Sequence, residues 1–149
     1  MPAVNTSAAA HLLTLPVRLH GIQLGRPVDL LLDREELRVL GFDVRCRDDE
    51  HRFLPLPTAA ISDDAITIQS PLVLLEEDEL AFYRARALTL ASLRGCQVTR
   101  GGRFAGALKD VVVAPGGSLV EVVVDAGGVE HTLPFDASVR FEPGSRTAA

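Results

Sequence analysis

Short runs of apolar residues, separated by turns rich in glycine, proline or acidic residues, run along most of the chain. Three such runs in the C-terminal part are separated by Gly-Gly turns at 115–117 and 126–128; the runs span 106–114, 119–125 and 129–133. A Gly-Gly turn between Val-rich runs is typical of a β-hairpin. The pattern therefore predicts antiparallel strands here.

The N-terminal part has the same character. Its expected strands are short and regularly spaced, at 28–32, 37–46, 52–56 and 66–68, with a charged turn at 47–50. Many short strands at even spacing favour a small β-barrel, because closure removes exposed strand edges. We expect an all-β protein.

One order of residues occurs twice. Valines, glycines, an aspartate and an apolar triplet recur in 17–32 and 98–113, so that Asp29 and Asp110 stand 81 residues apart. A Leu-Pro step recurs with an offset of 79 residues, at 54–55 and 133–134. We interpret the chain as two copies of one strand pattern, since a repeat dictates architecture.

Between the two copies, the spacing of apolar residues changes from that of strands to that of a helix. Residues 76–93 contain neither glycine nor proline, begin with Glu76 to Glu79, and carry Arg84 and Arg86 later, an order that complements the helix dipole. The predicted organisation is a flexible N-terminus (1–14), a first module (15–75), a linking helix (76–92), a second module (93–143) and a flexible C-terminus (144–149). Each module is near the lower size limit for an independent core, so separate barrels and one shared core both stay open.

The second copy resembles the PRC-barrel family. The resemblance rests on Leu93-Arg94-Gly95-Cys96-Gln97-Val98, a Gly-rich turn, Gly106, Asp110 with its valine triplet, and Leu133-Pro134. It covers nearly all of 93–142. The first copy, about 15–75, looks like a more divergent member that lacks the Gly-x-x-Val opening and inserts residues around 58–64.

The resemblance implies two small PRC-type barrels in tandem, joined by a helix. PRC-barrels occur in the H subunit of photosynthetic reaction centres and in a ribosome maturation factor that docks on a ribosomal protein, and they bring no catalytic residues with them. It therefore implies a non-catalytic, protein-binding adaptor or an assembly or regulatory factor. The alternative is a ribosome-associated RNA-processing or maturation factor. We assign no catalytic, cofactor-binding or metal-binding residue.

Composition and charge limit the classes of partner that the chain can be expected to bind. The 149 residues are 47% apolar and carry a net charge of −5, which opposes attraction to phosphate backbones. The only basic cluster with an aromatic residue is 94–109. No apolar run approaches the roughly 20 residues of a membrane span, and 1–10 does not resemble a secretion signal. We expect a cytoplasmic protein without membrane insertion, bound to another protein; self-association stays open.

The candidates for chemistry have simpler explanations. Consecutive residues 48–51 alternate in direction, which favours a solvated turn over a metal site. The glycines of 101–106 precede a strand, which favours a turn over a phosphate loop. The four acids that open the linking helix are explained by the helix dipole, with an acidic docking stripe or paired catalytic carboxylates as the alternatives. The histidines are single and unpaired in sequence: His11, His20, His51 and His131.

The recurring Asp29 and Asp110 predict a structural role, in which each carboxylate accepts backbone N–H bonds. A paired interaction site is the alternative. Cys46 and Cys96 lack a CxxC spacing and are expected as structural thiols, with a disulfide or a reactive thiol as alternatives. A small-ligand or enzyme site in a crevice between the modules is the remaining hypothesis.

Overall fold

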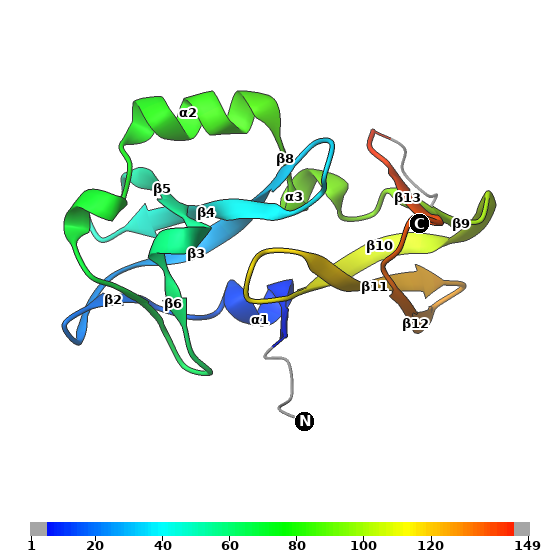
Figure 1. Cartoon of the computed structure of the whole chain (residues 1–149), viewed down its shortest axis with the longest axis horizontal. Coiled ribbons are helices and arrows are strands. Elements are labelled where there is room, and N and C mark those ends of the chain that lie inside the picture. Colours follow the sequence, from blue (N-terminus) through cyan, green and yellow to red (C-terminus); the bar gives the residue numbers. More distant parts are fainter. Residues whose placement is uncertain (1–5, 145–149) are drawn as a thin grey trace.

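The computed structural model describes residues 6–144, which form a mostly β protein with two sheets that lie side by side along the long axis (Figure 1). The first sheet contains β2 (Val17–Leu19), β3 (Ile22–Asp33), β4 (Val39–Cys46), β5 (His51–Pro55), β6 (Ala60–Ile61), β7 (Ile66–Ile68) and β8 (Ala87–Thr89). The second contains β1 (Ser7–Ala8), β9 (Gln97–Arg100), β10 (Arg103–Val113), β11 (Leu119–Ala126), β12 (Val129–Pro134) and β13 (Val139–Glu142). The helices are α1 (Ala9–Leu12), α2 (Glu77–Arg86) and α3 (Leu90–Leu93), with 3-10 turns η1 (Leu56–Thr58) and η2 (Pro71–Val73).

The two sheets have matching strand order. The first runs β5-β4-β3-β2-β7-β6 and the second β12-β11-β10-β9-β13. Residues 81 apart occupy the same register positions: Val17 pairs with Gly25, and Val98 with Gly106. One difference is that β7 pairs with β2 in parallel, whereas β13 pairs with β9 antiparallel.

The irregularities match as well. The long strand of each sheet has a β-bulge directly before its aspartate, at Val28 in β3 and at Lys109 in β10. Bulges bend a strand and re-aim the residues that follow. The equivalent bulges therefore place Asp29 and Asp110 in equivalent positions.

The N-terminal half of the chain builds most of the first sheet and the C-terminal half, from β8 onward, builds most of the second. Each half contributes a short segment to the sheet of the other. We call β1 with α1 (7–12) and β8 with α3 (87–93) the exchanged segments, because each pairs with the long strand of the other half. Ser7 pairs with Val113, and Leu88, 81 residues later, pairs with Leu32. The exchange is thus reciprocal.

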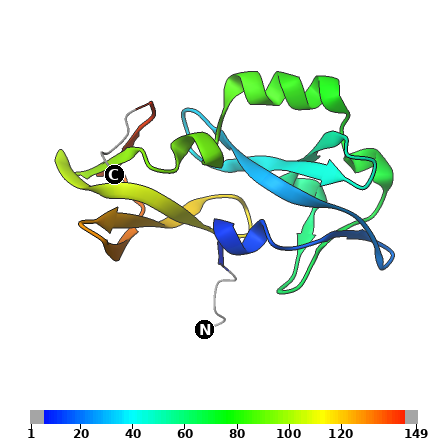
Figure 2. The same ribbon diagram turned by 180° about the vertical axis from the view of Figure 1, so that it is seen from behind.

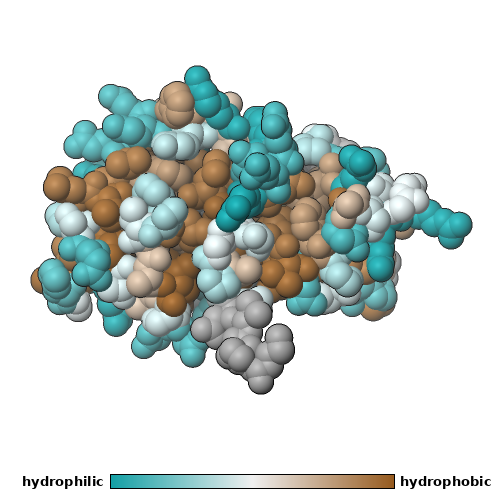
Figure 3. All heavy atoms as spheres, in the orientation of Figure 1, coloured by the Kyte–Doolittle hydropathy of each residue, from teal (hydrophilic) through white to brown (hydrophobic). Residues whose placement is uncertain are grey.

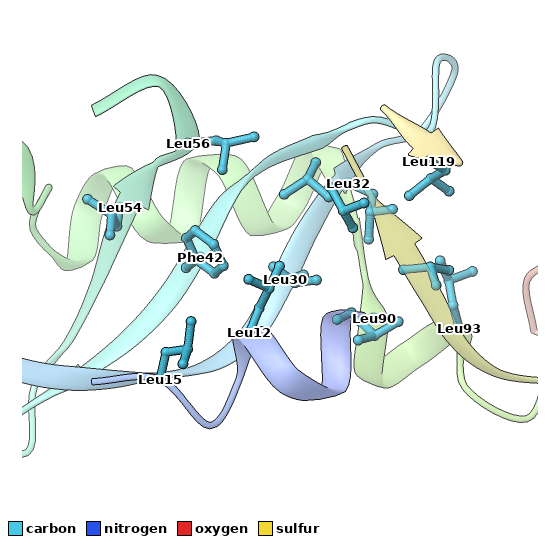
Figure 4. Close-up of a cluster of buried hydrophobic side chains, with 14 of the residues drawn as sticks. Leu12, Leu15, Leu30, Leu32, Phe42, Leu54, Leu56, Leu90, Leu93 and Leu119 are labelled. Atoms are coloured by element: carbon cyan, nitrogen blue, oxygen red, sulfur yellow. The ribbon is translucent and has the colours of Figure 1, made fainter. Parts of the chain in front are cut away.

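A single main core joins the halves. Figure 4 shows leucines from α1, β3, α3 and β11 gathered in one cluster. Leu12, Leu30, Leu90 and Leu93 are at most 2% exposed, and full burial of such a side chain contributes roughly 1.5–3 kcal/mol. Of the two alternatives left open by the sequence, the structure has the shared core.

Several expectations need correction. No closed barrel is found within residues 6–144, since each sheet is open between its terminal strands, β5 and β6 in the first and β12 and β13 in the second. The helix expected over 76–92 ends at Arg86, because the chain then becomes extended to form β8.

At the N-terminus, residues 7–12 form an exchanged segment with Ala9 and Leu12 in the core, although the sequence placed them in a flexible terminus. The remainder of that terminus, 1–5, and residues 145–149 of the predicted flexible C-terminus lie outside the described residues.

Helix α2 covers only the first sheet. The view from behind shows it lying over β3, β4 and β5, and within 6–144 no comparable helix lies beside β11 and β12 (Figure 2). Its outer surface is mostly hydrophilic, whereas apolar residues reach the surface over the strands below it (Figure 3). Every helix in the described part of the chain is too short or too polar to cross a bilayer.

Candidate functional site

The two recurring aspartates bind the exchanged segments. The Ala91 N–H of α3 donates to Asp29 Oδ1 at 3.1 Å, and the Ala10 N–H of α1 donates to Asp110 Oδ1 at 3.1 Å. Each carboxylate also accepts the N–H of the residue that follows it, at 2.9 Å in both halves. The predicted role as acceptors of backbone N–H bonds is confirmed.

Burial raises the pKa of the Asp29 carboxyl above its ordinary value. The N–H donors of Ala91 and Leu30 oppose that rise, and the neighbouring Asp43 carboxylate adds to it. Asp29 is therefore a structural hydrogen-bond acceptor, and keeping it ionised in its partly buried position costs free energy.

A buried charge cluster lies between the first sheet and α2. Asp43 of β4 is 2% exposed; its Oδ1 lies 2.8 Å from His51 Nδ1, and the Arg84 guanidinium of α2 donates to its Oδ2. Beside this cluster the rings of Phe53 and Tyr83 stack with centroids 4.4 Å apart. The cluster joins β4, β5 and α2, so its chemistry is that of an anchor for the helix.

Sequence reasoning did not find this cluster. The signal was present, because Asp43 is the only charged residue in the otherwise apolar run 39–44, and a charge in a buried strand requires a partner. The partner Arg84 is 41 residues away and could be identified only from the fold.

A cleft of about 520 Å³ lies where the halves meet, a volume in the range of small-ligand pockets. Its floor is apolar, with Leu12, Phe42 and Val113, and its rim carries Ser62 and Asp63. The residues of the described chain form no group of three His, Cys, Asp or Glu that could hold a metal ion. The cleft offers apolar contact and a few rim hydrogen bonds.

The other candidates from the sequence are dispersed. Asp48 and Asp49 form ion pairs with Arg52 and Arg45 in the exposed turn, at 2.9 and 2.8 Å. Cys46 and Cys96 are buried and are not joined in a disulfide. The turns of 101–106 form the β9–β10 hairpin, with Gly101 and Gly102 at positive φ. The acids Glu76 to Glu79 are exposed at the start of α2. Three histidines are exposed and far apart in the chain: His11 in α1, His20 in the turn between β2 and β3, and His131 in β12.

The clearest candidate surface is the outer side of the second sheet. We define the open face as Val112, Val123 and Thr132, together with the acidic residues beside them, Glu121, Asp125 and Glu130. Cross-strand pairing places Val112 beside Glu121, Val123 beside Thr132, and Asp125 beside Glu130. Neighbours on one face of a sheet form a continuous surface.

The same positions in the first sheet are covered by α2. Leu31, Asp43 and Phe53 occupy the places of Val112, Val123 and Thr132, because Leu31 pairs with Gly41 and Asp43 with Phe53 in the same register. These three are buried, whereas Val112 and Val123 are partly exposed and Thr132 is exposed.

The adjoining strand edges differ too. In the first sheet, Phe53 and Leu75 exchange backbone hydrogen bonds of 2.9 and 2.8 Å, so the segment before α2 pairs with the edge of β5. Within residues 6–144 nothing pairs with the free edge of β12. The second sheet therefore presents both a face and an edge that its counterpart has covered.

Comparison of the sequence with protein-family models and with curated proteins finds no match.

Proposed function

We propose that the chain is a non-catalytic, protein-binding adaptor or assembly factor, built from two repeats of the PRC-barrel type. The observation that carries the proposal is the unequal cover of two equivalent sheets: the positions of Leu31 and Phe53 are buried under α2, and those of Val112 and Thr132 are open. A sheet face and edge left free in this way is suited to a protein partner.

The positions of the ionisable groups support binding rather than catalysis. Asp29 and Asp110 hold the exchanged segments, and Asp43 holds α2 through Arg84 and His51. A catalytic acid or base needs an oxygen or nitrogen atom that is free to exchange a proton with a substrate. The oxygens of these carboxylates instead accept hydrogen bonds from the protein itself.

Support for the PRC type comes from the repeat. Gly106 and Asp110, which carry the resemblance, lie in the long strand β10, and Gly25 and Asp29 take the same positions in β3. A side chain on Gly106 would collide with the Asp125 carbonyl oxygen at 2.7 Å, which explains why a glycine is needed there.

RNA binding is the weaker candidate. Two members of the basic cluster are paired with carboxylates, Lys109 with Glu130 at 3.1 Å and Arg94 with Asp110 at 3.8 Å. Arg103 and Phe104 remain exposed at the β9–β10 hairpin. A filter-binding titration with structured RNA at rising salt tests this candidate, and salt-sensitive binding at low ionic strength would favour it over the adaptor role.

The adaptor proposal is tested by affinity purification of the full chain from cells that express it naturally. A protein partner recovered in a fixed stoichiometric ratio is the expected result. Recovery of the chain alone in repeated preparations, both without cross-linking and after reversible cross-linking, would contradict the proposal.

A further inference from the structure

We infer that the open face binds an amphipathic helix with lysine or arginine along its polar side, supplied by a different protein. This inference rests on the proposed adaptor function and names the kind of segment that the adaptor binds. The molecule provides the template for the complex, because its own α2 occupies the equivalent place on the first sheet.

The template defines the geometry. In the first half, Leu75 pairs with the edge of β5, and the chain then turns into α2, whose Leu80 and Tyr83 face the sheet. Leu80 is 1% exposed and Tyr83 stacks on Phe53. A partner segment of one extended residue followed by about three helical turns would repeat these contacts on β12 and on the open face.

The open face suits such a helix in size and polarity. Val112 and Val123 are small and partly exposed, so an apolar helix stripe with large side chains can fill the space above them. Val120, which is 37% exposed at the start of β11, adds apolar surface beside Glu121.

Charge identifies the partner further. Where the covered sheet carries Arg26, Arg45 and His51 in one cross-strand row, the open sheet carries Ala107, Asp125 and Glu130. Helix α2 begins with three acidic residues in its first turn. This row is thus acidic on the open side, with Glu130 paired to Lys109 at 3.1 Å, and the complementary helix is basic, as α2 is where its Arg84 meets the buried Asp43.

The acidic row of the open face argues against a second copy of this chain as the occupant. The acidic first turn of α2 would face Asp125, Glu130 and Glu121, and like charges at an interface are unfavourable. It also argues against RNA, whose phosphates would meet the same carboxylates.

The experiment places photoreactive p-benzoylphenylalanine at Thr132 of the full chain, with Ala85 on the outer side of α2 as the control position. After irradiation in lysate of cells that express the chain naturally, we expect an adduct at 132 and none at 85. Mass spectrometry of the adduct should identify a Lys- or Arg-bearing segment with apolar residues at helical spacing. An adduct with an acidic segment, with a second copy of this chain or with RNA would overturn the inference, as would no adduct.

A charge series at the same exposed position gives a second measurement. Thr132→Lys should lower partner recovery by roughly tenfold or more, whereas Thr132→Glu should leave it within about twofold. Val28→Lys, at an exposed bulge of the first sheet, is the matched control and should change nothing. Equal thermal midpoints of the variants establish that folding is intact.

The two proposals fail in different ways. If a partner is recovered but Thr132→Lys does not weaken its recovery, the open face is the wrong surface and the adaptor proposal stands. If the unmodified chain recovers no partner, the adaptor proposal fails, and the basic-helix inference fails with it.

Discussion

At the scale of single residues, three carboxylates of this protein hold other segments in place through hydrogen bonds and an ion pair. Asp29 and Asp110 each receive two backbone N–H groups, one of them from the opposite half. Asp43 is almost fully buried and depends on His51 and Arg84 to compensate its charge. The two kinds of site predict different responses to substitution.

Replacing Asp29 separates its charge from its hydrogen bonds. Asp29→Asn retains an acceptor oxygen without a charge, whereas Asp29→Ala leaves two N–H groups unsatisfied and should cost about 1–3 kcal/mol of unfolding free energy. Because the folded-state pKa of Asp29 is raised, the folded state binds this proton more tightly than the unfolded state. This contribution to stability is present at low pH and is lost as pH rises through the folded pKa.

The stability of Asp29→Asn relative to the unchanged protein should therefore increase between about pH 4 and pH 7. Urea unfolding of both proteins at the two pH values measures the difference. A relative stability that stays constant, or that falls with rising pH, would show that the Asp29 pKa is not raised in the fold.

Removing Arg84 should loosen α2. Arg84→Ala leaves the Asp43 carboxylate buried with only His51, and because Arg84 itself is half-exposed we expect a loss of about 1–2 kcal/mol. Arg86→Ala is the control: this side chain lies over the exposed Phe82 ring at 3.8 Å, and its loss should cost no more than about 0.5–1 kcal/mol. Chemical denaturation compares the two, and equal losses would argue against an anchoring role for Asp43.

At the scale of elements, the sequence predicted what local chemistry determines. Gly-Gly turns and Val-rich runs predicted the β9–β10, β10–β11 and β11–β12 hairpins, and the spacing of residues 81 apart matches the observed register. The exchanged segments were missed because α1 and α3 have four residues each, too few for a helical period to be visible. Two identical pairs at the 81-residue spacing, Ala10 with Ala91 and Leu12 with Leu93, indicated their equivalence.

The open face was also out of reach of pattern reasoning. An alternating strand such as β11 predicts that one face is buried, but the pattern cannot tell whether a helix covers the other. The acids that open α2 were correctly placed at a helix start. That this helix covers one sheet, while no helix within 6–144 covers its counterpart, depends on the path of the chain in space.

The turn between β10 and β11 offers a sharp test of packing between the halves. Gly117 has a φ of 94°, and a Cβ there would lie 2.7 Å from the Val39 carbonyl oxygen and 2.8 Å from Leu56. Gly117→Ala should therefore cost at least about 2 kcal/mol, from backbone strain and collision.

Its neighbour Gly116 is the matched control. Gly116→Ala meets only the Arg38 guanidinium at 3.7 Å, an ordinary contact, and should change stability by less than about 0.5 kcal/mol. Thermal unfolding of the two variants measures the contrast. Similar midpoints would mean that the turn does not pack closely against β4.

At the scale of the whole molecule, the shared core and the exchange predict that both halves unfold together. Tyr83 is the only tyrosine, and the chain has no tryptophan, so tyrosine fluorescence reports on the first sheet alone. Far-UV circular dichroism reports on both sheets. We expect the two signals to follow one transition with the same midpoint; a second transition visible only by circular dichroism would show that the halves are independent.

The reciprocal exchange also predicts that covalent continuity between the halves is dispensable. Leu72 is 86% exposed in η2, on the connection that leads to α2. A protein split after this residue would leave two polypeptides, each still holding a strand and a short helix that complete the other's sheet. Co-expressed as separate pieces, 1–72 and 73–149 should reassemble into a stable pair that elutes together on size exclusion, so that the molecule behaves as a dimer whose subunits happen to be tethered.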